Sequence, residues 1–234
     1  AEIIEGPSAE TLTPGQAALV RIAGVRVTLD RQDDTGAPGF NLLVPVEGVE
    51  AVVQALVGDL ELAAGPLREG TRPAIRLGGW AAFNVARIEA GTPVFFVDFG
   101  PDSLPHETSL LASRVHFAKG CYLGQEVVAR MESRGHPKQR LVALRFDRAA
   151  ATDGQWPEPQ TGAGLFTGPE PTSETEPAIG AITSACPSPM LGGEPVALAM
   201  VKFAHAGTGS RLWVDVGDRR VEAIVQDGLR TLPA

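Results

Sequence analysis

Residues 119–130 read KGCYLGQEVVAR, and this stretch contains the only tyrosine of the chain and one of its two cysteines. Cys121 lies between Gly120 and Gly124. Glycine is used where the backbone bends in ways closed to other residues or approaches another group closely. We therefore expect Cys121 to lie in a turn with its sulfur accessible. Lys119 is two residues away, and a nearby ammonium group favours the reactive thiolate.

Composition supports a second interpretation of Cys121, because free cysteines are among the residues most often buried. In that interpretation the thiol is a small apolar side chain of the core. The other cysteine, Cys186, stands between Ala185 and Pro187 and matches no reactive pattern. We expect Cys186 to have a structural role.

The segment KGCYLGQE resembles the signature of the YgfZ family, KGCYxGQE, at all seven of its fixed positions. Proteins of this family bind folate and are related to the glycine cleavage T-protein, an aminomethyltransferase. The resemblance implies tetrahydrofolate as the cofactor, and support of iron–sulfur cluster assembly or repair as the function. The partners it implies are cluster-assembly proteins and cluster-dependent enzymes, including those of tRNA modification. It also implies reactive positions at Cys121 and Lys119, and cofactor-binding positions at Tyr122, Gln125 and Arg130.

Residues 86–93, ARIEAGTP, resemble the R-x-E-A-G-x-P segment of the T-protein family. This resemblance implies that Arg87 and Glu89 bind the cofactor, with Glu89 on the pterin ring. The chemistry is suitable, because a carboxylate accepts two parallel hydrogen bonds from an aminopyrimidine edge. The alternative is a solvated helical glutamate, the commonest setting for this residue type.

The first part of the chain alternates between strand and helix patterns. Residues 25–31 and 40–44 read as strands joined by a long turn, and residues 46–57 have apolar side chains at helical spacing up to Gly58. A second helix is predicted over residues 80–90, which Gly91 and Pro93 follow. Residues 94–97, VFFV, read as a short buried strand.

The last part of the chain has the pattern of a small β-barrel or sandwich, with short strands separated by turn residues. The predicted strands are residues 141–146, 179–185, 195–203, 211–216 and 221–225. The segment GAITS at residues 180–184 resembles the G-x-(I/V)-T-S strand of the C-terminal T-protein barrel.

The predicted fold class is therefore α+β. A T-protein-like folate-binding region over residues 1–140 precedes a C-terminal β-barrel over residues 141–234. Because the resemblance covers only the middle and C-terminal parts of the family, we expect the first region to be incomplete at its N-terminus.

A net charge of −8 argues against broad binding to nucleic acids or anionic membranes. Residues 1–10 lack the basic and apolar regions of a signal peptide, and two cysteines are too few for a disulfide scaffold. These features predict a cytoplasmic protein. No cluster of cysteine and histidine has the spacing of a metal site, so no metal is predicted.

Two other functions are compatible with the sequence. One is a folate-dependent aminomethyltransferase or one-carbon transfer enzyme, although T-proteins lack the cysteine signature. The other is an RNA-associated factor that uses a local basic patch over residues 119–140. Outside these motifs, His106 and Glu107 either line a site or belong to a capping cluster at a helix start, and we favour the capping cluster.

Overall fold

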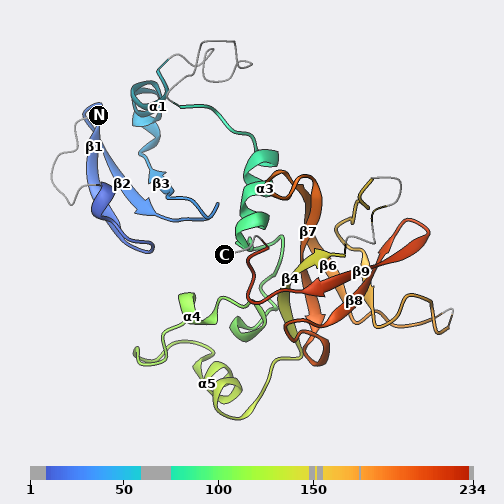
Figure 1. Cartoon of the computed structure of the whole chain (residues 1–234). Helices are drawn as coiled ribbons and strands as arrows, with labels where there is room; N and C mark the ends of the chain where they lie inside the picture. Colours follow the sequence, from blue (N-terminus) through green and yellow to red (C-terminus); the bar gives the residue numbers. More distant parts are fainter. Residues whose placement is uncertain (1–8, 59–74, 148–150, 152–154, 174, 232–234) are drawn as a thin grey trace. The chain divides into compact units, whose positions relative to one another are not determined.

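The computed structural model describes residues 9–58, 75–147, 151, 155–173 and 175–231. Its contacts divide the chain into one compact unit up to Asn84 and a second from Val85 onward. The division falls within helix α3, Trp80–Ala90, and each unit is described by itself (Figure 1). The predicted domain boundary at residue 140 is close to the first barrel strand, which begins at Gln139, and stays a prediction.

The first unit is a small antiparallel sheet packed against a helix. Its strands, in spatial order, are β1 (Ala17–Ile22), β2 (Val25–Arg31) and β3 (Phe40–Leu43). A 3₁₀ turn, η1 (Ala9–Thr11), precedes them, and η2 (Val46–Gly48) leads into helix α1 (Val49–Val57). The predicted strand pair and the helix ending at Gly58 are confirmed. Strand β1, which pairs with β2 across the tight turn at Ala23 and Gly24, was not predicted.

The core of this unit lies between the sheet and α1, and alternate strand residues such as Val20 and Val27 meet Val52 there. Gly48 allows the close approach, since a Cβ at that position would lie 2.4 Å from Cγ1 of Val25. A side chain at residue 48 would therefore push α1 away from β2.

The second unit is built around a closed antiparallel barrel. Its strands are β4 (Gln139–Phe146), β5 (Gly164–Phe166), β6 (Gly180–Ser188), β7 (Glu194–Lys202), β8 (Arg211–Val216) and β9 (Arg219–Val225). They pair in the order β4-β7-β6-β5-β8-β9, and β4 closes the barrel against β9. The 3₁₀ turns η5 (Pro189–Leu191) and η6 (Phe203–His205) follow β6 and β7. The structure thus selects the barrel from the two predicted alternatives.

Both faces of strand β4 are buried, because side chains alternate along a strand. Leu144 and its partners fill the barrel interior, whereas Leu141 and Ala143 on the outer face pack with Ile88 of α3. The C-terminal half of α3 is therefore fixed to the outside of the barrel.

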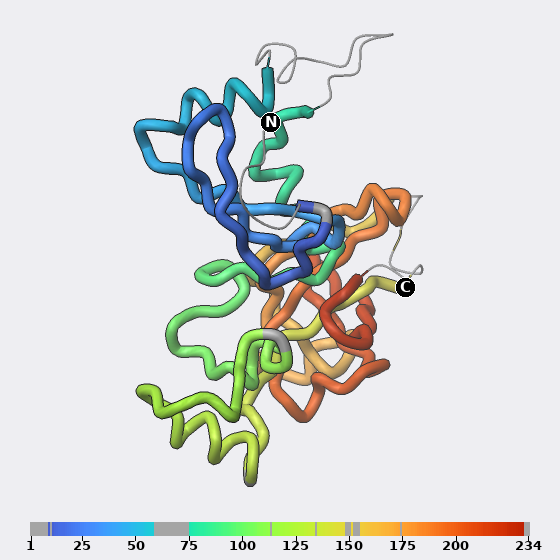
Figure 2. The backbone as a smooth tube through the Cα atoms, turned by 90° about the vertical axis from the view of Figure 1, so that its left-hand side faces the viewer, coloured from blue at the N-terminus to red at the C-terminus, as the bar shows by residue number. Residues whose placement is uncertain are grey.

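A lobe of short elements precedes β4 and projects from the barrel in both views of the backbone (Figures 1 and 2). It contains η3 (Pro105–Glu107), α4 (Leu111–Arg114) and α5 (Gln125–Arg134). Glu107 accepts a hydrogen bond from the backbone N–H of Leu104 at 3.0 Å, which closes η3 as the capping interpretation predicted.

The prediction of a buried strand over residues 94–97 is wrong. Phe95, Phe96 and Val97 are exposed, and the segment forms a turn that contains a single bridge from Phe95 to Phe99. The cause is Asp98. Its carboxylate accepts a hydrogen bond from the N–H of Val94 at 2.8 Å, and this bond holds residues 94–98 in a turn. Phe96 takes a φ of 66°, in the left-handed region that is uncommon for aromatic residues.

Candidate functional site

Arg87, on α3, is fully enclosed and forms an ion pair with Asp98. Its Nη1 lies 2.5 Å from Oδ2 of Asp98, and neither side chain has any exposed surface. Nη2 donates to Oγ of Ser184 at 2.6 Å, and Nη1 also approaches the carbonyl oxygen of Thr92 at 3.3 Å. Buried charges need such a complete set of partners, because taking them out of water is costly. Arg87 therefore fixes α3 to strand β6.

Asp98 is the centre of this network, because it accepts from both sides of its carboxylate. Thr183 and Ser184 approach Oδ1 at 2.7 and 2.6 Å, opposite the Arg87 contact at Oδ2. Successive residues of a regular strand point to opposite faces. Here the register between β6 and β7 shifts between Ile182 and Ser184, and this bulge brings both hydroxyls to the same carboxylate oxygen. The Thr-Ser pair of the barrel motif thus has a structural role.

Glu89 lies two residues after Arg87 on α3 and is 7% exposed. Its Oε1 accepts from Oγ of Ser188 at 2.5 Å and from the N–H of Met190 at 3.2 Å. Oε2 makes no hydrogen bond to any residue that the structure describes. Glu89 thus holds the turn between β6 and β7 with one oxygen and leaves the other available.

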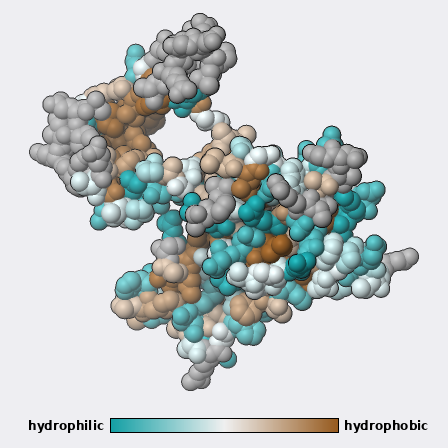
Figure 3. All heavy atoms as spheres, in the orientation of Figure 1, coloured by the Kyte–Doolittle hydropathy of each residue, from teal (hydrophilic) through white to brown (hydrophobic). Residues whose placement is uncertain are grey.

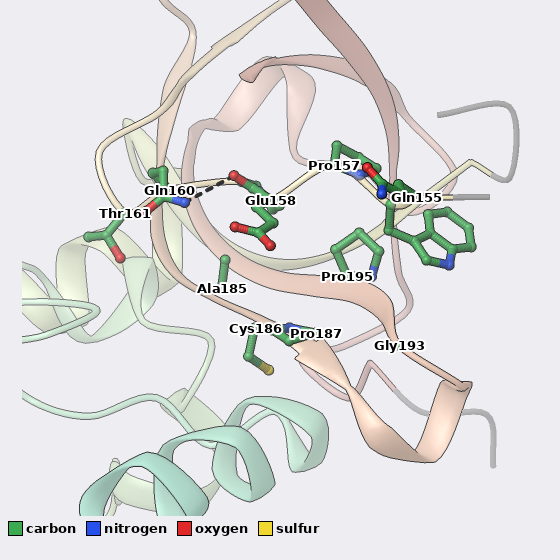
Figure 4. A pocket seen from close by; sticks show the side chains of 12 residues that line it. Gln155, Pro157, Glu158, Gln160, Thr161, Ala185, Cys186, Pro187, Gly193 and Pro195 are labelled. Carbon is green, nitrogen blue, oxygen red and sulfur yellow. Dashed lines mark hydrogen bonds between the residues drawn. The ribbon is translucent and has the colours of Figure 1, made fainter. Parts of the chain in front are cut away.

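Cys186 is buried, which agrees with the structural role predicted for it. Burial, with a smaller contribution from the negative charge of Glu89, raises the pKa of Cys186 to about 11. Its sulfur points toward α3, at 4.0 Å from the carbonyl oxygen of Val85 (Figure 4). This thiol stays protonated at neutral pH and is unsuited to nucleophilic chemistry.

A pocket of about 560 Å³ opens beside Cys186, between the chain segment 155–161 and the ends of β6 and β7 (Figure 4). Its walls include Pro157, Pro187 and Pro195, and the side chain of Glu158 extends toward Ala185. None of the predicted site residues lines this pocket, since Cys186 was predicted to be structural.

The signature segment, residues 119–126, is mostly exposed, in contrast to the buried surroundings of Cys186. Cys121 is exposed, in irregular backbone between the turn at Phe117 and helix α5. The prediction of an accessible sulfur is confirmed. Gly124 takes a φ of 85° at the N-cap position just before α5, which explains one of the two glycines that flank the cysteine.

Lys119 lies over the ring of Tyr122, with its Nζ 4.7 Å from the ring centroid. This cation–π contact closes the loop that carries Cys121 between them. Tyr122 and Gln125 are half-buried, and Arg130 is exposed on α5. The side chain of Arg134, which belongs to the predicted basic patch, lies outside the described residues.

Apolar side chains are also exposed in this lobe. Leu123 is completely exposed, and Phe117 and Val127 expose about half of their surface, at 48% and 52%. Figure 3 shows hydrophobic surface in the area of α4 and α5. Exposed apolar groups around a thiol are typical of a surface that contacts another molecule.

The predicted site residues therefore fall into two groups. Arg87 and Glu89 belong to the buried network on β6, whereas Cys121, Lys119, Tyr122, Gln125 and Arg130 lie on the projecting lobe. The partners of Arg87 and Glu89 named above lie on β6, in the turn after it and in the segment 92–98, whereas Lys119 contacts Tyr122 within the lobe. Sequence reasoning missed Asp98 and the hydroxyls of β6, because only the fold brings them to Arg87.

Two kinds of feature are absent from the described residues. These residues contain no group of three or more histidine, cysteine, aspartate or glutamate side chains arranged to hold a metal ion. None of their helices combines the length and the apolar composition that crossing a bilayer requires.

Residues 140–228 match the family described as the glycine cleavage T-protein C-terminal barrel domain. This range begins one residue after β4 starts and ends three residues after β9. The match therefore covers the closed barrel and the strands that Arg87 and Glu89 contact.

Curated relatives are similar to the chain over a longer range. An aminomethyltransferase of Saccharopolyspora erythraea is 31% identical over 197 residues, which are 83% of this chain and 46% of the relative. An aminomethyltransferase of Corynebacterium jeikeium is 29% identical over 228 residues, which are 95% of this chain and 51% of the relative. The chain thus spans about half the length of the curated relatives it matches.

The crystal structure of the glycine cleavage system aminomethyltransferase T from Bartonella henselae has the same fold, with a TM-score of 0.71 at 21% identity. The match covers 97% of this chain and 54% of that chain. The predicted α+β class with a C-terminal barrel is confirmed. Residues 140–228 match the T-protein C-terminal barrel domain, and the chain as a whole is similar to aminomethyltransferases over 83% to 95% of its length.

Proposed function

We propose that the chain is a YgfZ-like, tetrahydrofolate-binding protein that supports iron–sulfur cluster assembly or repair and cluster-dependent enzymes. The observation that carries the proposal is the exposed thiol of Cys121 within KGCYLGQE, since an accessible thiol is required for redox or cluster chemistry. Kinship to aminomethyltransferases supports the folate part of the proposal.

Of the two residues on α3 that the motif assigns to folate, Glu89 has an oxygen available for a ligand and Arg87 does not. The guanidinium of Arg87 is enclosed by Asp98 and Ser184, so a ligand would have to break a buried ion pair to reach it. Glu89 offers one free oxygen, Oε2, in place of the two-oxygen contact that the motif implied. In this proposal Glu89 contacts the pterin ring through Oε2, and Arg87 positions the helix that carries Glu89.

On the projecting lobe, Cys121 supplies the thiol and Lys119 supplies a nearby positive charge. The contact between Lys119 and Tyr122 keeps the loop in one shape, and Gln125 and Arg130 lie on α5, the helix that follows the loop. Cys121 provides at most one ligand to a cluster, so any cluster contact needs further ligands from a partner.

The thiol role is tested with Cys121→Ala, expressed in cells that lack their own protein of this type. The activity of an iron–sulfur enzyme in those cells should fall to the level without any rescue. Cys186→Ala is the matched control, because it removes the buried thiol and leaves the signature intact. Full rescue by Cys121→Ala would refute the role of the thiol.

The folate role is tested with Glu89→Gln. The amide oxygen of glutamine still accepts from Ser188 and Met190, so the turn is kept, while the open Oε2 becomes an N–H₂ group that cannot accept. Tetrahydrofolate binding, followed by fluorescence quenching, should weaken about tenfold, as expected for loss of a charge-assisted hydrogen bond. Glu126→Gln on exposed α5 is the control, and equal affinity of all three proteins would contradict the assignment.

The second candidate is a folate-dependent aminomethyltransferase, which the names of the relatives favour. Incubation with tetrahydrofolate and a one-carbon donor should then yield methylenetetrahydrofolate. Turnover that survives Cys121→Ala would favour this candidate over the first.

A further inference from the structure

A second cavity, of about 600 Å³, lies within the lobe that carries the signature. It is bounded by η3, α4, α5, the first residues of β4, and η6. Its polar side chains are His106, Ser109, Glu132 and Arg140, and its aromatic walls are Phe117 and Phe203. This volume is typical of sites that hold a small organic molecule.

Arg140 is the charged group of the cavity whose donors are available to a ligand. It is exposed, and its Nε donates to Oγ of Ser109 at 3.2 Å. Its two terminal amino groups make no hydrogen bond or ion pair to any residue in the described parts of the chain. A guanidinium held at Nε presents a planar pair of donors, which matches a carboxylate.

Ser109 has the backbone strain that is found at functional positions. Its φ is 57°, in the left-handed region, where residues other than glycine are uncommon. In this conformation its Oγ donates to the carbonyl oxygen of Leu141 at 2.7 Å and accepts from Arg140. The strained residue thus orients the guanidinium, and such strain persists where the surrounding structure enforces it.

His106 adds a buried polar group to the cavity wall. Its side chain is 8% exposed, and its Nε2 lies 3.2 Å from Oε2 of Glu132. Its Nδ1 is buried and has no hydrogen-bond partner among the described residues. Buried polar atoms without partners are rare in native proteins and mark places where another molecule completes the bonding.

We propose that this cavity binds a small organic monocarboxylate with an apolar or aromatic body. The carboxylate pairs with the terminal amino groups of Arg140, and the body lies between Phe117 and Phe203. A dianion such as phosphate fits less well, because Arg140 is the only arginine or lysine among the described lining residues, and the Glu132 carboxylate opposes further negative charge. The site is distinct from the folate contact proposed at Glu89, and it does not depend on that proposal.

The cavity is also connected to the signature, since Phe117 lies four residues before Cys121 and Glu132 lies on the helix that follows. A ligand in this cavity therefore lies next to residues that precede and follow the loop that holds the thiol. We expect occupancy of the cavity to change the rate at which Cys121 reacts with an alkylating reagent.

The experiment uses benzoate as the probe and benzamide, its neutral isostere, as the ligand control. Binding to the full chain is followed through the NMR signals of the His106 ring, assigned with His106→Gln, and of the Trp156 indole in the other pocket. Benzoate should shift the His106 signals and leave Trp156 unchanged, and benzamide should bind at least about tenfold more weakly.

Arg140→Gln should weaken benzoate binding about tenfold. The affinity of Arg140→Lys should lie between those of the parent protein and Arg140→Gln, because lysine keeps the charge but loses the planar pair of donors. Arg26→Gln, at an exposed arginine on β2 that does not line the cavity, should leave binding unchanged. Equal binding of benzoate and benzamide, shifts confined to Trp156, or an unchanged affinity in Arg140→Gln would overturn the proposal.

Discussion

Arg87 and Asp98, eleven residues apart, form an ion pair that no water reaches, and strand β6 supplies the hydroxyl that completes it. Removing one charge from such a pair leaves the other buried without compensation. We predict that Asp98→Asn lowers the free energy of unfolding of the second unit by about 3–5 kcal/mol. Urea denaturation followed by the circular dichroism of the barrel measures this.

The surface pair Arg211–Glu222 provides the control for that prediction, because the Arg211 side chain is 71% exposed. Arg211→Met should change the free energy of unfolding by less than about 1 kcal/mol. If the two variants lose similar stability, the buried pair has no special role in holding α3 to the barrel.

Gly91 ends α3 in a place where no other residue fits. Its φ is 75°, and a Cβ there would lie 2.2 Å from the carbonyl oxygen of Leu229. Gly217, in the turn between β8 and β9, has a similar φ of 64° but open space around it. We predict a cost of about 1–2 kcal/mol for Gly217→Ala from the backbone alone. Gly91→Ala should cost about 1–3 kcal/mol more because of the clash, as measured by denaturant unfolding.

The raised pKa of Cys186 predicts a loss of stability in alkali. The folded protein keeps the thiol protonated up to a pKa of about 11, whereas the unfolded chain ionises at its ordinary value near 9.0. The unfolded state therefore binds fewer protons over this range, and stability falls as pH rises from about 9 to about 11. Unfolding midpoints measured across this range should decline less in Cys186→Ala than in the parent. Parallel declines in the two proteins would assign the effect to other groups.

The two cysteines should differ strongly in reactivity. Cys121 is exposed and Cys186 is buried, so iodoacetamide should label one thiol per chain under native conditions and both in urea. Intact mass spectrometry counts the labels, and peptide mapping identifies the residue. Native labelling of Cys186 at a similar rate would mean that the β6 region opens readily.

The barrel could be predicted from the sequence because its long strands are apolar or alternating segments separated by turn residues. Strand β5 was missed, since three residues, Gly164–Phe166, are too few to show a period. The prediction of a strand over residues 94–97 was wrong for a different reason. Its apolar composition favours a strand, but the carboxylate of Asp98 captures the backbone N–H of Val94 and turns the chain.

The candidate site was predictable only where a motif is local. The glycines beside Cys121, all within residues 119–126, favoured its exposure over the burial that is common for free cysteines, and the thiol is exposed. The surroundings of Arg87 are not local, because Ser184 lies 97 residues away and reaches it through a strand bulge. Nothing near Arg87 in the sequence indicates that its guanidinium is enclosed.

The same separation has a consequence for the synthesis of the protein on the ribosome. Arg87 and Glu89 leave the exit tunnel well before Ser184 and Ser188 are translated, and at about 5–20 residues per second the delay is on the order of 5–20 s. During that interval Arg87 has Asp98 available, but the Ser184, Ser188 and Met190 groups that complete the bonding of Arg87 and Glu89 do not yet exist. Final docking of α3 is therefore a late event, and a chain stalled before β6 is a natural substrate for chaperones.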